Sequence, residues 1–135
     1  IASIFLDGEE VVSVADARGN KNVYRASREK VDIPMVVLVN GNSASASEIL
    51  AGALQDNKRA LLVGQKTYGK GLVQTVYPLR NGGALKLTTQ KYFTPDGTDI
   101  NEIGINPDYT IENNPESDQD LQLNKATELI KEQIY

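Results

Sequence analysis

The sequence predicts an α/β fold with a parallel strand–helix–strand unit at its centre. Two continuous apolar runs of strand length, residues 35–39 and 60–63, lie on either side of a segment with helical spacing at residues 43–56. A continuous apolar run suits a strand that is covered on both faces, as in a parallel sheet. A later pair of strand-like segments surrounds a glycine-rich turn, which is typical of a hairpin. With 135 residues, one domain is the expectation.

The elements before and after this centre follow from shorter patterns. Residues 1–6 are apolar without a preceding cap, so we interpret them as the end of an element that begins upstream. Residues 11–14 and 23–25 are short strand candidates, joined by a turn that contains Gly19. Pro34 opens the first apolar run.

The second half of the chain predicts the hairpin and a terminal helix. Residues 72–79 and 85–93 flank Asn81-Gly82-Gly83, and the second strand alternates, so we expect one of its faces to be solvated. A polar linker at residues 112–120 leads to a C-terminal helix. The apolar residues of this helix are spaced three and four apart and are Leu123, Ala126, Ile130 and Ile134.

Composition excludes several kinds of chemistry. The chain has no Cys and no His, which excludes thiol nucleophiles, disulfides, thiolate metal sites and every catalytic arrangement that needs imidazole. The formal net charge is −4, so we expect no nucleic-acid partner. No apolar run approaches the length of about 18 residues that a membrane span needs. A hydrolase of this composition must use a carboxylate or a lysine as its base.

The first candidate site is the serine-rich segment 42–48, between the first apolar run and the helix. Ser45 with Glu48 three residues later matches a capping box, which would be a structural role. Alternatively, Ser45 is a nucleophile at a helix N-terminus, where free amides and the helix dipole stabilise an oxyanion. The local pattern alone leaves both interpretations open.

The second candidate is residues 64–71, directly after the second apolar run. It nearly matches a phosphate-binding loop, but Gly71 stands where a hydroxyl is required, and a strand follows where a helix is needed. An exposed structural lysine is the simplest interpretation of Lys70 taken alone.

The two segments are predicted to meet. If the apolar runs are neighbouring parallel strands, their carboxyl ends share one sheet edge, which places Ser45 near Lys70. A Ser–Lys pair is a known variant of the catalytic triad. A free lysine, with a pKa of about 10.4, is a poor base at neutral pH and needs burial or a positive potential. We therefore expect the Lys70 side chain to be buried close to the Ser45 hydroxyl.

Together these residues resemble the carboxyl-terminal processing peptidases, or tail-specific proteases, a family of Ser–Lys serine endopeptidases. The resemblance runs from about residue 34 to residue 110. The matching segments are 39–49, 53–56, 63–64, 67–75, 85–89, 92–97 and 104–108.

The resemblance implies specific roles. Ser45 would be the nucleophile, Lys70 the general base and Gln74 the residue that orients the lysine, while the amide of Ala46 would be one oxyanion donor. Asp56 has been treated as functional in some relatives, but we expect a structural role. Ser43 and Ser47 are expected to be caps or packing residues.

The resemblance also implies a core like that of the ClpP and crotonase enzymes and cleavage of protein substrates near their C-terminus. We expect no cofactor and no metal. Members of the family usually act outside the cytoplasm and use a PDZ domain to capture the substrate tail or gate the site. We therefore expect residues 1–111 to be the C-terminal portion of a catalytic domain whose upstream strand and PDZ domain are missing, and residues 112–135 to be the linker and helix. We expect the isolated piece to lack activity and to self-associate. The alternative is a catalytically silent member that binds peptides.

Overall fold

The computed structural model describes residues 1–113, 116 and 118–134, so part of the predicted linker lies outside the described residues. In chain order the elements are α1 (Ala2–Phe5), β1 (Glu10–Asp16), β2 (Lys21–Arg25), β3 (Val36–Val39), α2 (Ala46–Asp56), β4 (Leu61–Gly64), β5 (Leu72–Pro78), β6 (Ala84–Phe93), β7 (Tyr109–Thr110) and α3 (Leu121–Ile134). The predicted α/β class is confirmed, and α1 and β7 are additions to it.

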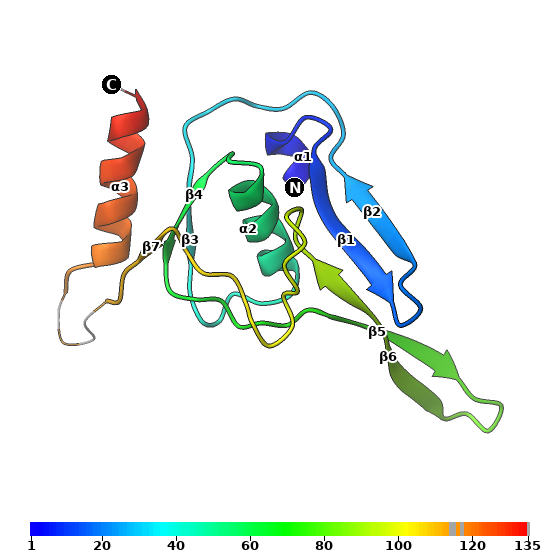
Figure 1. The fold of residues 1–135 in the computed structure, drawn as a ribbon. Coiled ribbons are helices and arrows are strands. Elements are labelled where there is room, and N and C mark those ends of the chain that lie inside the picture. The colour runs from blue at the N-terminus through cyan, green and yellow to red at the C-terminus, as the bar shows by residue number, and fades with distance from the viewer. Residues whose placement is uncertain (114–115, 117, 135) are drawn as a thin grey trace.

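The strands form two sheets around the central helix α2. One sheet is parallel in the order β3-β4-β7, and the other is antiparallel in the order β2-β1-β6-β5. Helix α2 lies between them and contacts both β1 and β4, while α3 covers the opposite side of the parallel sheet (Figure 1). Small side chains such as Ala51 and Ala53, both buried, allow this close packing of α2.

The parallel pair β3–β4 positions the candidate site. Its register joins Val36 to Leu61 and Val39 to Gly64, with α2 as the connection between the strands. Both strands therefore end at the same edge of the sheet, as predicted. Gly64 has a φ of 133°, and a Cβ there would lie 2.0 Å from the carbonyl oxygen of Val39, so only glycine fits.

One prediction about β3 is wrong. The apolar run 35–39 was expected to be covered on both faces, but β3 is the edge strand of its sheet and Leu38 is 45% exposed. Val37 and Val39 pack in the core against α2. The strand thus packs one face against α2, with Val39 buried and Val37 half-buried, and leaves the other incompletely covered.

The hairpin β5–β6 forms as predicted but is more exposed than expected. Its outer half projects away from the two layers (Figure 1), and residues 84–88 are exposed on both faces of the strand rather than on one. Apolar side chains on this projecting part are between 45% and 57% exposed; they are Val76, Tyr77, Leu79, Leu85 and Leu87.

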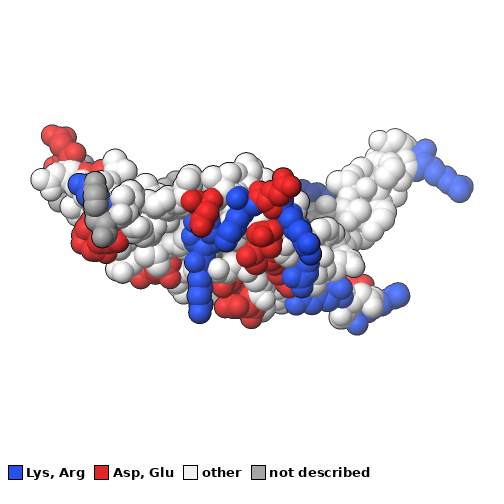
Figure 2. All heavy atoms as spheres, turned by 90° about the horizontal axis from the view of Figure 1, so that it is seen from above, with Lys and Arg blue, Asp and Glu red and all other residues white. Residues whose placement is uncertain are grey.

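Helix α3 packs on β3 and β4 through a face that only partly matches the predicted one. Of the four predicted residues, Ala126 is buried and Ile130 is half-buried, whereas Leu123 and Ile134 are about half exposed. Leu129, which was not predicted, is also buried. The spacing correctly predicted the helix, but the position of its contact depends on the sheet that it covers. On the face shown in Figure 2, basic and acidic side chains are intermixed.

Candidate active site

Ser45 occupies the N-cap of α2, at the end of the tight turn that follows β3. Its φ is 56° and its ψ is −110°, a conformation that residues other than glycine rarely adopt. Such a strained backbone persists only where the surroundings hold it, and it is concentrated at functional sites. The predicted capping box with Glu48 is present, so Ser45 is a helix cap whatever else it does.

Ala46 is the first residue of α2, directly after Ser45. The first amides of a helix have no acceptor within the helix, and the helix dipole makes this end electropositive. The Ala46 amide is one of these N-terminal amides. Its role as an oxyanion donor stays a prediction.

Glu48 joins the start of α2 to the loop that carries Lys70. Its side chain is fully buried. One carboxylate oxygen, Oε2, accepts hydrogen bonds from the amides of Ser45 (2.8 Å) and Lys70 (2.9 Å). The other, Oε1, accepts from the Thr67 hydroxyl and the Gly69 amide, both at 2.6 Å. Because two of these bonds end on one oxygen, the backbones of Ser45 and Lys70 are held within two hydrogen-bond lengths of each other.

These hydrogen bonds also keep Glu48 ionised. Burial raises the pKa of the Glu48 carboxyl, but the bonds donated by Thr67, Lys70, Gly69 and Ser45 outweigh it, and the net pKa lies below the usual value. A negative charge next to the start of α2 is also favourable because of the helix dipole. The sequence pointed to Glu48 only as a cap, and its link to the second loop was missed.

Lys70 is placed beside Ser45 by its backbone, but its side chain does not behave as predicted. It is exposed, and in the described part of the chain no hydrogen bond joins it to Ser45. It borders an open depression of about 550 Å³, whose wall consists of Asn42, Ala44, Tyr68, Gly69, Lys70, Asn101 and Glu102. The expectation of a buried lysine is therefore wrong, because the loop backbone is held inward while the side chain emerges into this depression.

The glycines on either side of Lys70 are required by close packing. A Cβ on Gly71 would lie 2.4 Å from the amide nitrogen of Asn101, and one on Gly69 would lie 3.0 Å from that of Gly104. Gly69 also accepts a backbone hydrogen bond from Glu102. The Gly-Lys-Gly sequence thus lets the lysine loop lie directly against the turn at residues 100–104.

Gln74 lies on β5 opposite Thr88, and its side chain donates a 3.5 Å hydrogen bond to the Thr88 hydroxyl. Within the described residues, no hydrogen bond joins it to Lys70. Its proposed orienting role is therefore untested.

The remaining candidates have structural contacts. The Ser43 hydroxyl accepts from the amide of Asn40, which closes the turn before α2, and Ser47 is exposed. Asp56, at the other end of α2, accepts from the amide of Asp96. The phosphate-loop interpretation fails as expected, because β5 follows the loop where a helix would be needed.

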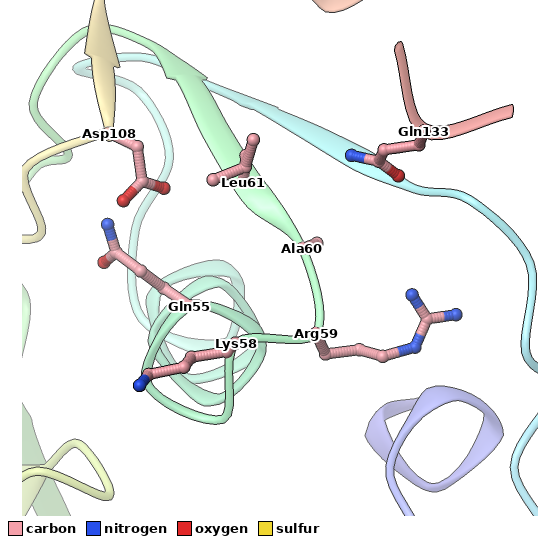
Figure 3. A pocket seen from close by; sticks show the side chains of 7 residues that line it. All are labelled: Gln55, Lys58, Arg59, Ala60, Leu61, Asp108 and Gln133. Carbon is pink, nitrogen blue, oxygen red and sulfur yellow. The ribbon is translucent and has the colours of Figure 1, made fainter. Parts of the chain in front are cut away.

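A second depression, of about 300 Å³, lies at the C-terminal end of α2, away from Ser45 (Figure 3). Two of its charged lining residues have structural partners: Arg59 donates to the carbonyls of Phe5, Val31 and Ile33, and Asp108 accepts from the Leu62 amide. Within the described residues, no group of acidic, His or Cys side chains could hold a metal ion. The described helices are also too short or too polar to cross a membrane.

Comparison with known proteins identifies the family. The profile of peptidase family S41 matches residues 1–111. The chain therefore belongs to peptidase family S41.

Individual relatives agree with this assignment. The chain is 46% identical to the chloroplastic C-terminal processing peptidase of Tetradesmus obliquus and covers 25% of that protein, with 83% of this chain aligned. It is also 46% identical to the carboxyl-terminal-processing protease of Picosynechococcus sp., with 96% of this chain and 33% of the relative aligned. The solved photosystem II D1 C-terminal processing protease superposes with a TM-score of 0.79 at 46% identity, over 82% of this chain and 29% of that one. The chain thus spans a quarter to a third of the length of these relatives.

Proposed function

We propose that this chain carries the Ser–Lys dyad of a serine endopeptidase, with Ser45 as nucleophile and Lys70 as general base. The observation that carries the proposal is the Glu48 carboxylate, which holds the amides of both residues on one oxygen. A serine and a lysine that the fold fixes in this way are the nucleophile and base available to a chain without histidine.

The proposed reaction has two halves. The Ser45 hydroxyl attacks the scissile carbonyl while the Lys70 amine accepts its proton, and the amide of Ala46 donates to the oxyanion. Collapse of this intermediate transfers the proton to the leaving amine and leaves an acyl-enzyme. Water, deprotonated by the same lysine, then hydrolyses the ester. Gln74 is proposed to orient the lysine amine.

The exposed position of Lys70 gives a substrate a direct role in the proposal. A lysine amine works as a base at neutral pH when it is shielded from water. A peptide that fills the depression beside Asn42, Tyr68 and Lys70 would exclude water there. Residues 1–111, as the C-terminal portion of a larger catalytic domain, would receive further cover from an upstream strand. That upstream part would also supply the second oxyanion donor.

The relatives suggest the substrate and the setting. Their names describe processing of carboxyl termini, and some are named as chloroplastic. We accordingly propose that the larger protein cleaves proteins near their C-terminus outside the cytoplasm, with a PDZ domain that captures the substrate tail. The alternative is a catalytically silent member of the family that binds peptides. It is favoured by the Lys70 side chain, which is exposed and, in the described residues, makes no hydrogen bond to Ser45.

Hydrolysis of an unstructured protein substrate by the larger protein separates these functions. Ser45→Ala and Lys70→Ala should each abolish cleavage while circular dichroism remains unchanged. Lys70→Arg should fail as well, because a guanidinium does not give up its proton in proteins. Substantial cleavage by Lys70→Arg would overturn the general-base role, and cleavage by Ser45→Ala would overturn the nucleophile.

A further inference from the structure

Thr67 is a buried polar residue to which the proposed dyad assigns no role. It lies in the loop between β4 and β5, and it is 5% exposed. Its hydroxyl donates to Glu48 Oε1 at 2.6 Å and accepts from the Ile105 amide at 2.8 Å. The Thr67 backbone amide donates in turn to the Ile105 carbonyl oxygen. One side chain therefore connects α2, the lysine loop and the turn at residues 100–105.

The Thr67 bond fixes the rotation of the Glu48 carboxylate. Oε2 reaches the amides of Ser45 and Lys70 because Oε1 is held on the opposite side by Thr67 and Gly69. A β-branched side chain is stiff about χ1, so the Thr67 hydroxyl is a well-defined anchor. The Ile105 amide donates to the Thr67 hydroxyl oxygen, which leaves the hydroxyl proton free to point at Glu48.

We propose that Thr67 is a positioning residue for the dyad: its hydroxyl orients the Glu48 carboxylate, which sets the spacing between Ser45 and Lys70. This inference rests on the proposed peptidase function. Asn101 and Glu102, on the same turn as Ile105, border the depression beside Lys70, so Thr67 also ties that wall to the nucleophile. Catalysis is sensitive to such spacing, since a misplacement of about 1 Å can cost about 100-fold in rate.

Two substitutions at Thr67 isolate the hydroxyl. Thr67→Val keeps the shape but removes the donor to Glu48 and the acceptor for Ile105. Thr67→Ser keeps the hydroxyl and removes only the methyl group. The matched control is Thr94→Val, because Thr94 is equally buried (4% exposed) and also packs on α2, beside Gly52. Its hydroxyl accepts instead from the amide of Thr98 within its own turn.

The test measures kcat, KM and the rate of Ser45 modification by a fluorophosphonate in the larger protein that contains this chain. Thr67→Val should lower kcat and the modification rate by about tenfold or more, with KM changed by less than about threefold. Thr67→Ser should recover most of both rates. Thr94→Val should keep both rates even if it lowers the melting temperature as much as Thr67→Val does.

A Thr67→Val protein with the kcat of Thr94→Val would overturn the positioning role alone. If Thr67→Val does not fold, Thr67→Cys replaces it, because a thiol has the same connectivity as the serine hydroxyl but is only a weak donor and a weak acceptor. Thr67→Cys with the kcat of Thr67→Ser would equally overturn the inference. Cleavage that survives Ser45→Ala in the larger protein would instead refute the proposed function, and the inference with it.

Discussion

Glu48→Gln tests the buried carboxylate that joins the two halves of the site. The substitution preserves the shape and removes the charge. It also replaces one acceptor oxygen by an NH₂ group, which is a donor. Each oxygen of Glu48 accepts two hydrogen bonds, so whichever way the new amide rotates, two donors on Ser45 and Lys70, or on Thr67 and Gly69, lose their acceptor.

The expected loss of stability is large. A hydrogen bond to a charged group contributes about 1.5–3 kcal/mol, so two lost bonds correspond to roughly 3 kcal/mol or more. That is a substantial part of the about 5–15 kcal/mol by which a typical domain is stable. The matched control is Glu128→Gln, because Glu128 pairs with Lys125 on the surface of α3. Loss of an exposed pair costs less than about 1 kcal/mol.

The effect should depend on pH in a defined direction. The pKa of Glu48 is lowered in the folded chain, so its contribution is complete above the unfolded value of about 4.5 and is lost as the pH falls through the lower folded value. Urea unfolding of wild type, Glu48→Gln and Glu128→Gln at a series of pH values measures this. A Glu48→Gln difference below about 0.5 kcal/mol at pH 7, within the range of ordinary surface substitutions, would refute the reasoning. So would a difference that grows as the pH falls.

Three further predictions concern packing, tethering and assembly. Gly71→Ala forces a Cβ to 2.4 Å from the Asn101 amide nitrogen and should lower the melting temperature and the cleavage rate. Gly41→Ala, whose Cβ meets only the Lys66 carbonyl oxygen at 3.9 Å, should be close to neutral, and equal melting temperatures of the two variants would contradict this prediction. Arg59→Ala removes the donor to the carbonyls of Phe5, Val31 and Ile33 and should lower the free energy of unfolding in urea by about 2 kcal/mol or more. A loss of stability no larger than that of Lys58→Ala would show that these hydrogen bonds are not stabilising. The isolated 135 residues should self-associate through the free edge of β3 or the exposed apolar side chains of the hairpin. A single 14.7-kDa species in sedimentation at micromolar concentration would contradict this prediction.

The elements that the sequence predicts correctly are those with strong local signals. The runs that became β3 and β4, the helix between them and the turn at Asn81-Gly82-Gly83 all depend on short-range patterns, and the parallel pairing then follows from the connection. In contrast, β7 has only two residues, and its pairing with β4 depends on contacts distant in sequence. The buried face of α3, at Leu129, likewise depends on the sheet beneath it.

The same distinction applies to the site. Ser45 and Lys70 could be brought together from the sequence because two strand ends share an edge. The double role of Glu48 could not, because the capping box explains its position locally while its bonds to Thr67, Gly69 and Lys70 cross about 20 residues of sequence. The exposed Lys70 side chain was also missed, since burial of a side chain depends on everything that surrounds it.

The central claim is that Ser45 is a nucleophile activated by Lys70. Its most direct test is to treat the larger protein with a fluorophosphonate and to locate the adduct by mass spectrometry of peptides. We predict one modified residue, Ser45, with a modification rate that falls strongly in Lys70→Ala. An adduct on a different serine, or a Ser45 adduct that forms equally fast in Lys70→Ala, would contradict the account.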